Sequence, residues 1–256
     1  MSLRCVYTDL DGTLLGAGGS LFRDGEGAFS LLPARALEAS HRSGVEVVIM
    51  SGRRKAQVSE DARLMGQASY IYEVGSGVVI DGEETFLTGG FTPDDARTPH
   101  MLIEQSGAPA LLLEAYAGRL EHHAPWHLNR HVSHLFRGRV DVQEAQALLE
   151  EKGIEGLRLV DNGSVAGGDR AYHLIPDTAS KAAAVELHMR SRGYLPEECI
   201  AVGDSLEDLG VAPVVGRFFL VANAPDTSGA SQPNVVRTEA GHGAGFYEAV
   251  VRSLKD

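Results

Sequence analysis

Two aspartates near the start of the chain, Asp9 and Asp11, have the type and spacing needed to act together at one reacting centre. They follow a β-prone run over residues 5–8, and Gly12 breaks that run directly after them. Side chains at positions i and i+2 of an extended segment point to the same side, so the two carboxylates would repel unless one is protonated or a cation lies between them. Such a pair suits nucleophilic attack by one carboxylate and proton transfer by the other. The same residues also suit an Asp-rich turn that closes a strand, and the pair alone leaves both interpretations open.

Two further acidic residues, Asp204 and Asp208, come directly after another strand-like run, residues 200–202. If the two runs are neighbouring parallel strands, all these carboxylates meet at the same edge of a sheet. Carboxylate oxygens are the ligands that Mg²⁺ prefers in proteins. The sequence therefore predicts a magnesium site at that edge.

A hydroxyl and an ammonium group follow two other predicted elements. Ser51 comes after the buried strand-like run 45–50, and the backbone N–H groups of Gly52 and Arg53 lead into a helix. Such a turn can hold the oxygens of a phosphate. Lys181, in the first turn of a later helix, adds the positive charge that a phosphoryl group needs during transfer.

These groups need a scaffold that brings several strand ends together, and the chain outside residues 85–170 alternates strand-like and helix-like stretches. This alternation predicts an α/β fold with a doubly wound, mainly parallel sheet of the Rossmann-like kind. The expected strands are residues 5–8, 45–50, 69–73, 77–80, 171–176, 200–202, 218–222 and 234–237, and the expected helices are residues 32–43, 55–65, 180–190 and 246–254.

The pattern changes between residues 85 and 170. Two amphipathic stretches (residues 94–105 and 142–152) accompany two strand-like runs (residues 111–113 and 157–160), and the Gly-rich residues 163–168 mark an exit. We therefore expect an inserted smaller α/β cap domain over residues 85–170. The core domain is then formed by residues 1–84 and 171–256.

Composition limits the classes of partner. The 256 residues carry a net charge of −12, which opposes binding to nucleic acid or to an anionic membrane surface. The sequence shows no apolar run of about 20 residues and no signal-peptide pattern. Cys5 and Cys199 lie in strand-like runs and are expected to be core residues of a protein in a reducing cytosol. We expect a cytoplasmic protein, monomeric or homodimeric, that acts on a small molecule.

The polar groups named above fall into four motifs whose order resembles that of the haloacid dehalogenase-like phosphohydrolases. The insertion lies between the second and third motifs, as in the type II, subclass B members of that superfamily. In chain order the motifs are Asp9-Leu10-Asp11-Gly12-Thr13, Ser51-Gly52-Arg53, Lys181, and Gly203-Asp204-Ser205-Leu206-Glu207-Asp208.

The resemblance implies a Mg²⁺-dependent phosphomonoester hydrolase. Asp9 would form an aspartyl-phosphate, and Asp11 would protonate the leaving oxygen and then deprotonate water. Mg²⁺ would be held by Asp9, the backbone carbonyl of Asp11 and Asp204, with Asp208 binding it directly or beside those ligands. The candidate phosphate and substrate contacts are Gly12, Ser51, Gly52, Arg53, Lys181 and Asn223. For Asn223 we also consider a role in orienting Asp204 or in a simple loop turn.

Within the superfamily, two stretches resemble the phosphosugar phosphatases, in particular those that act on mannosyl-3-phosphoglycerate: residues 72–77 and residues 245–250. Two positions depart from that branch, since Val74 and Glu207 stand where asparagines are usual. The expected substrate is a small phosphorylated sugar or sugar acid. Two alternatives stay open, a phosphotransferase or phosphomutase acting on sugar phosphates and a non-catalytic phosphosugar-binding regulator.

Half of the ten histidines are clustered within residues 122–134 of the predicted cap, and they suggest either a metal stripe or a polar cap surface. Pro125 argues against one continuous helix, so we favour a solvated or substrate-facing surface over residues 119–139, with residues 163–168 as a hinge. His173 is expected to be a satisfied strand residue. The five histidines are His122, His123, His127, His131 and His134.

Overall fold

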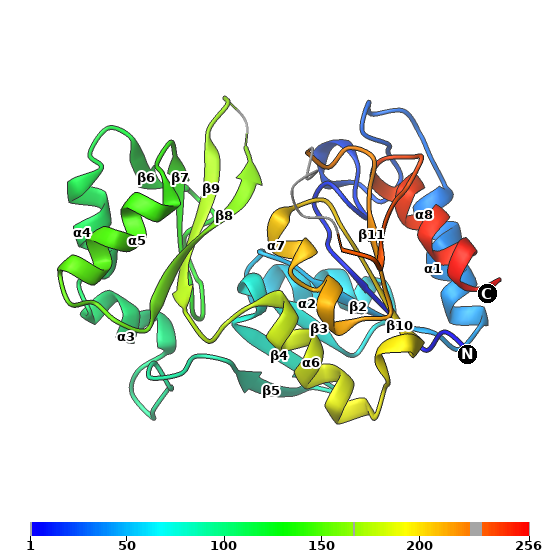
Figure 1. Cartoon of the computed structure of the whole chain (residues 1–256), viewed down its shortest axis with the longest axis horizontal. Helices are drawn as coiled ribbons and strands as arrows, with labels where there is room; N and C mark the ends of the chain where they lie inside the picture. Colours follow the sequence, from blue (N-terminus) through cyan, green and yellow to red (C-terminus); the bar gives the residue numbers. More distant parts are fainter. Residues whose placement is uncertain (1, 166, 226–231, 256) are drawn as a thin grey trace.

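In the computed structural model, which describes residues 2–165, 167–225 and 232–255, the chain forms two separate sheets with helices packed on each (Figure 1). The larger sheet has eight strands in the order β12-β11-β10-β1-β2-β3-β4-β5. The first six of that order are parallel, and β4 and β5 are antiparallel additions at one edge. The predicted mainly parallel, doubly wound sheet is confirmed. Its strands are β1 Cys5–Thr8, β2 Glu46–Met50, β3 Tyr70–Tyr72, β4 Gly77–Ile80, β5 Glu83–Phe86, β10 Cys199–Gly203, β11 Arg217–Leu220 and β12 Val235–Arg237.

Helices cover both faces of this sheet, which is why its central strands are continuous apolar runs rather than alternating ones. One face packs against α1, α2 and α8 and the other against α6 and α7. The helices are α1 Leu32–Arg42, α2 Lys55–Leu64, α6 Lys181–Arg192, α7 Leu206–Leu209 and α8 His242–Ser253, and short 3₁₀ turns occur at Ala17–Gly19, Glu73–Gly75, Pro196–Glu198 and Ala212–Val214.

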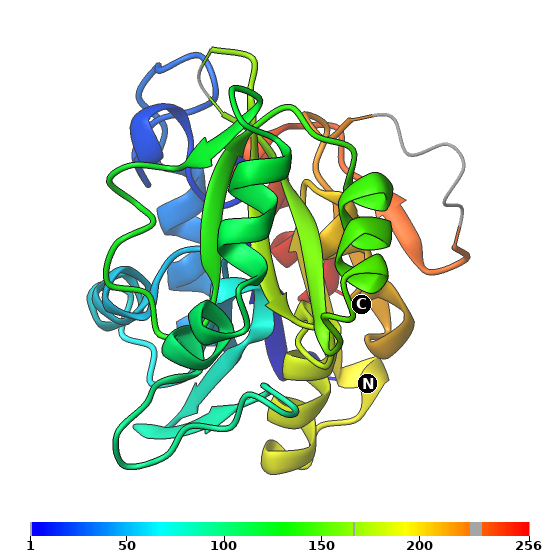
Figure 2. The same cartoon turned by 90° about the vertical axis from the view of Figure 1, so that its left-hand side faces the viewer.

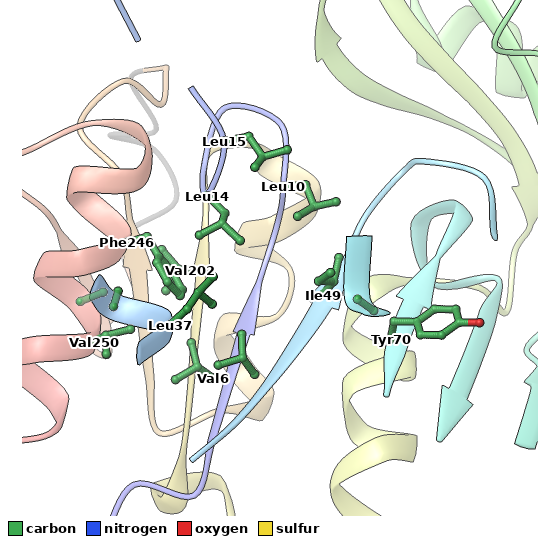
Figure 3. Close-up of a cluster of buried hydrophobic side chains, with 14 of the residues drawn as sticks. Val6, Leu10, Leu14, Leu15, Leu37, Ile49, Tyr70, Val202, Phe246 and Val250 are labelled. Atoms are coloured by element: carbon green, nitrogen blue, oxygen red, sulfur yellow. The ribbon is translucent and has the colours of Figure 1, made fainter. Parts of the chain in front are cut away.

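The first face shows how the core holds β1 and β10 in place. Val6 and Val202 project from these neighbouring strands toward Leu37 of α1 and Phe246 and Val250 of α8 (Figure 3). Each fully buried side chain of this kind contributes about 1.5–3 kcal/mol to stability. The strand ends that carry the acidic motifs are therefore fixed by dense packing below them. No helix of the described residues is long and apolar enough to cross a membrane.

The second sheet has four antiparallel strands in the order β6-β7-β9-β8. Three helices cover one of its faces, and Figures 1 and 2 show that this is the face turned away from the larger sheet. The uncovered face therefore looks toward the larger sheet. The elements are β6 Leu120–His122, β7 His134–Gly138, β8 Leu157–Ser164, β9 Arg170–Pro176, α3 Pro99–Gln105, α4 Ala108–Ala115 and α5 Val142–Glu151.

Three expectations for this part of the chain are wrong. Residues 171–176 form a strand, but it pairs with β7 and β8 and not with the larger sheet, so the return to the core lies after Pro176 and not at residue 171. Gly163, Gly167 and Gly168 belong to the β8–β9 hairpin and not to an exit hinge. Residues 111–113 lie within α4, because a short apolar run is compatible with a buried helix as well as with a strand.

The connections between the two sheets run side by side. The Thr178 hydroxyl donates to the carbonyl of Leu87, 3.3 Å away, and so joins the segment after β5 to the segment after β9. Gly89 has a positive φ of 51°, and a Cβ there would lie 3.1 Å from the Thr178 hydroxyl oxygen. We take these two segments as the linkers of the cap.

Candidate active site

The carboxyl ends of β1, β2 and β10 meet at one edge of the larger sheet because the three strands are adjacent and parallel. Asp9, Ser51 and Asp204 directly follow them. One oxygen from each of Asp9, Asp204 and Asp208 lies within 4.8 Å of the others. The structure thus brings the acidic residues of the first and fourth motifs together at the sheet edge.

Lys181 lies at the centre of this acidic group. Its Nζ donates to Asp9 Oδ1 at 2.8 Å and to Asp208 Oδ1 at 2.5 Å, and its side chain is fully buried. The lysine is the first residue of α6, and Ser180 caps that helix by accepting from the Ala183 N–H. The helix start therefore sets the position of the ammonium group.

Burial and neighbouring charges shift the pKa values of Asp9, Asp204 and Lys181 at this edge. Burial, opposed by Lys181, raises the pKa of Asp9 well above its usual value. Burial, reinforced by Asp208, raises the pKa of Asp204 to about 6. Burial opposes the charged form of Lys181, yet the carboxylates of Asp208 and Asp9 outweigh it and raise its pKa. The carboxylates outnumber the one lysine, so the site favours a further cation, and three close carboxylates suit Mg²⁺.

The loop after β1 approaches these carboxylates closely. Gly12 has a φ of 84°, and a Cβ at that position would lie 2.4 Å from Asp204 Oδ2, so only glycine fits. The Thr13 hydroxyl donates to Asp204 Oδ1 at 3.0 Å. The Asn223 amide donates to the Gly12 carbonyl at 2.8 Å and accepts from the His242 N–H at 2.7 Å. Asn223 thus holds the Gly12 loop in place. These two hydrogen bonds of its side chain go to Gly12 and His242 and not to Asp204.

Arg53 is paired with two acids rather than open for a ligand. Its guanidinium donates to both carboxylate oxygens of Asp11, at 2.7 and 2.6 Å, and to Asp61 at 2.9 Å. The Arg53 N–H donates to the Ser51 hydroxyl at 3.2 Å. The predicted contact of this arginine with phosphate therefore requires both the side chain and the backbone to change partners.

Side chains of the cap reach the Ser51 turn. Arg130 donates twice to the Gly52 carbonyl, at 3.2 Å each. A Cβ on Gly52 would lie 2.6 Å from Asn162 Nδ2 and 3.1 Å from His173 Nε2. Burial, with Arg130 nearby, lowers the pKa of His173 well below its usual value, so its ring is neutral. Asn162 and His173 therefore lie against the candidate phosphate turn. The sequence had given no sign that Asn162 is near the site.

The His- and Arg-bearing stretch of the cap is only partly directed at this edge. The backbone of His131 contacts the larger sheet, whereas His134 stacks on His100, with ring centroids 3.9 Å apart. Arg137 pairs with Glu121 at 2.6 Å. Within the expected solvated or substrate-facing surface over residues 119–139, His134 and Arg137 are therefore engaged in contacts inside the cap.

Glu73 was not among the predicted site residues, yet its carboxylate joins the two sheets. It is fully buried and accepts the backbone N–H groups of His131, Val132 and Ser133 at 2.9, 3.0 and 2.7 Å, and the Ser133 hydroxyl at 2.9 Å. Three successive N–H groups form a natural anion-binding turn. Sequence analysis placed Glu73 at the end of the strand-like run 69–73 and in the family-like stretch 72–77, but neither pattern identifies its partners.

Known proteins resemble the chain over nearly its whole length. It is 27% identical to a phosphoglycolate phosphatase of Methanoculleus marisnigri over 97% of this chain and 95% of that protein. It is 23% identical to one of Methanococcoides burtonii over 100% and 99% of the two chains. No family model matches the chain.

Solved structures share the fold at low sequence identity. A sucrose-phosphatase of Synechocystis, solved with sucrose and phosphate, matches with a TM-score of 0.69 and 17% identity over 99% of this chain and 98% of that one. A Bacteroides thetaiotaomicron protein, described among phosphatases of the haloalkanoate enzyme superfamily, matches with a TM-score of 0.69 and 16% identity, over 98% and 95% of the two chains.

Proposed function

We propose that the chain is a phosphatase of the haloacid dehalogenase-like superfamily, and that it hydrolyses a small phosphomonoester through an aspartyl-phosphate on Asp9 with Mg²⁺ as cofactor. The observation that carries this proposal is the buried contact of Asp9 with Lys181 beside Asp204 and Asp208. A site that only bound phosphate would have no need of a buried carboxylate, which repels the ligand.

Asp9 would attack phosphorus, so that a bond forms to its carboxylate oxygen and the bond to the leaving oxygen breaks. The Asp9 side chain is 10% exposed, and Lys181 holds one of its oxygens, which orients the other. Lys181 would keep its positive charge throughout and contact the phosphoryl oxygens as they develop charge. The Ser51 hydroxyl lies at the end of β2 and would bind another of these oxygens.

Asp11 would give its proton to the leaving oxygen and then take one from the attacking water, which releases phosphate. Its carboxylate is 59% exposed, within reach of solvent, and held by both arms of Arg53. Proton transfer would require Asp11 to turn from Arg53 toward the substrate. Arg53 would then act as a positioning residue that returns Asp11 to a fixed place.

Asp9 and Asp204, with the backbone carbonyl of Asp11, would hold Mg²⁺. Asp208, whose oxygens accept from Lys181 and from the Asp204 N–H, would bind it directly or hold those ligands in place. When bound, Mg²⁺ supplies the positive charge that allows a phosphate dianion to approach these carboxylates. The Thr13 hydroxyl and the close approach of Gly12 would keep Asp204 in place for this role.

The leaving group would be a small acid or sugar. The names of the relatives favour 2-phosphoglycolate, and the motif resemblance favours a phosphorylated sugar acid such as mannosyl-3-phosphoglycerate. Both leaving groups carry a carboxylate. Asn162 and His173 of the cap would contact it, since both lie against the Ser51–Arg53 turn.

The test is phosphate release from a panel of 2-phosphoglycolate, sugar phosphates and phosphorylated glycerates, with wild type and Asp9→Asn. We expect wild type to turn over at least one of them without an acceptor alcohol, and Asp9→Asn to form no acid-stable phosphoenzyme and to show no turnover. Asp95→Asn, which changes an exposed aspartate, is the matched control and should behave as wild type. Near wild-type turnover by Asp9→Asn would refute the assigned nucleophile.

A further inference from the structure

A second cluster of chemically active side chains lies at the opposite edge of the larger sheet, near the amino ends of its strands. Cys5 of β1 is in register with Cys199 of β10 on one side and with Glu46 of β2 on the other. Cys5, Cys199 and their strand neighbours pack with α6, so this row faces that helix. Both cysteines are free and buried.

His188 of α6 completes the cluster. Its side chain is fully buried, and its Nδ1 lies 2.8 Å from the Tyr7 hydroxyl. Its Nε2 is also buried and has no hydrogen-bond partner among the described residues, although Glu46 Oε1 lies 3.5 Å away. A buried nitrogen without a partner is costly, and it points to a ligand.

One donor atom from each of Cys5, Glu46 and His188 lies within 4.8 Å of the others. We propose that these three residues form a second metal site, which takes a transition-metal dication of the zinc class. Cys5 Sγ, His188 Nε2 and a Glu46 oxygen bind the metal, and the Cys5 thiol releases its proton to solvent on binding.

The surroundings support such a site. A ligating histidine needs a partner for its other ring nitrogen, and the Tyr7 hydroxyl provides one. Glu46 is held by the hydroxyls of Ser69 and Tyr194, each at 2.9 Å, so its carboxylate is already oriented. Arg192 also contacts Glu46, and Asp81 balances the charge of that arginine.

The donor set separates this site from the one at the other edge. Sulfur and imidazole ligands favour zinc-class metals over Mg²⁺, whereas the carboxylates of Asp9, Asp204 and Asp208 favour Mg²⁺. A metal here would join β1, β2 and α6, and would act on stability rather than on phosphoryl transfer. The proposal does not depend on the phosphatase chemistry.

Co²⁺ is the probe, because a cobalt–thiolate bond gives a charge-transfer absorption that carboxylate ligands do not give. The reduced full-length protein, freed of metal and supplied with excess Mg²⁺, is titrated with Co²⁺ and then with Zn²⁺. We expect this band to saturate at one equivalent of Co²⁺ and to disappear when Zn²⁺ is added. Zn²⁺ should also raise the unfolding temperature.

Cys5→Ala and His188→Gln should lose the band, while Asp204→Asn, at the opposite edge, should keep it. Circular dichroism checks that each variant is folded. Absence of the band in wild type at excess Co²⁺ would overturn the proposal whatever the variants do. So would a band that persists in both Cys5→Ala and His188→Gln, or one that is lost in Asp204→Asn.

Discussion

Lys181 is the residue on which the electrostatics of the candidate active site depend. It is a fully buried ammonium between Asp9 and Asp208, and its charge offsets part of the repulsion among the acids of this edge. Removing one partner from a buried ion pair leaves the others uncompensated, which costs more than the pair itself contributes.

We therefore expect Lys181→Met to lower the free energy of unfolding by about 3 kcal/mol and to abolish turnover. The measurement is denaturant unfolding together with phosphate release. Lys152→Met, which removes an exposed lysine paired with Glu151, is the control and should change neither quantity by much. Unchanged stability in Lys181→Met would mean that the acids are already compensated without the lysine.

Removal of the metal tests whether the acidic residues need a cation for catalysis. Chelation should abolish phosphatase activity and leave the fold intact, because the acidic residues are fixed by packing beneath the strand ends. Restoring Mg²⁺ should recover activity and raise the unfolding temperature, since the cation offsets repulsion among Asp9, Asp204 and Asp208. Full activity in excess EDTA, after bound metal has been removed, would contradict it.

The sequence was enough to locate the charged motifs along the chain. It did not predict the backbone conformation at Val74, where the core domain contacts the cap. Val74 has a φ of 59°, a region that β-branched residues rarely adopt. It packs with Val160, Ile175 and Ala179, all from beyond β7 in the chain. This long-range burial offsets the local strain, and no local preference would have predicted it.

Buried histidines make the helices and strands of the cap sensitive to acid. Burial, reinforced by His100, lowers the pKa of His134 to about 3. Glu104 lies 3.3 Å from His134 Nδ1 and favours the charged form, but it is largely exposed, while His122 and Arg130 oppose that form. His134 therefore stays neutral in the folded cap at pH values where an unfolded histidine is charged.

The unfolded chain thus binds more protons, so stability should be present above a pH of about 6.5 and fall below it, by at most about 1.4 kcal/mol per pH unit for this group. We expect unfolding curves between pH 7 and pH 5 to show this loss, and His134→Gln to reduce it. His41→Gln changes an exposed histidine of α1 in the core domain. It should keep the wild-type dependence of the unfolding free energy on pH. An unchanged slope in His134→Gln would assign the loss to other groups.

Element type was predictable where a pattern or its boundary signals were clear, as for the amphipathic α5, for α6 with its Ser180 N-cap, and for β10, which Gly203 ends. It failed for residues 111–113, because three leucines have no period that separates strand from helix. It also failed for the partners of β9, because membership of a sheet depends on pairing with strands far along the chain. The strands β6 and β7 were missed since their turns and polar residues hide the alternation.

For the whole molecule, the contact between the two sheets decides how the cap lies over the strand ends. The Glu73 carboxylate is cupped by three backbone N–H groups of the cap, and Arg158 of the cap pairs with Glu207 at 2.9 Å. The backbone also ties Glu73 to the candidate phosphate turn, since its N–H donates to the Arg53 carbonyl at 3.0 Å. Glu73 thus links the cap to the Ser51–Arg53 turn.

We expect Glu73→Gln to loosen the cap while keeping the shape of the side chain. The amide of the glutamine turns its own N–H groups toward the N–H groups of residues 131–133. These donors then lose a negative charge and at least one acceptor, which should lower the free energy of unfolding by about 2–4 kcal/mol. Hydrogen exchange at these amides should quicken, and kcat/KM for the best substrate should fall more than that for p-nitrophenyl phosphate, whose leaving group needs no cap contacts. Glu83→Gln, in exposed β5, is the matched control and should leave both readouts unchanged. Unaltered exchange at residues 131–133 in Glu73→Gln would show that other contacts, such as those of Arg130 with the Gly52 carbonyl, hold the cap in place.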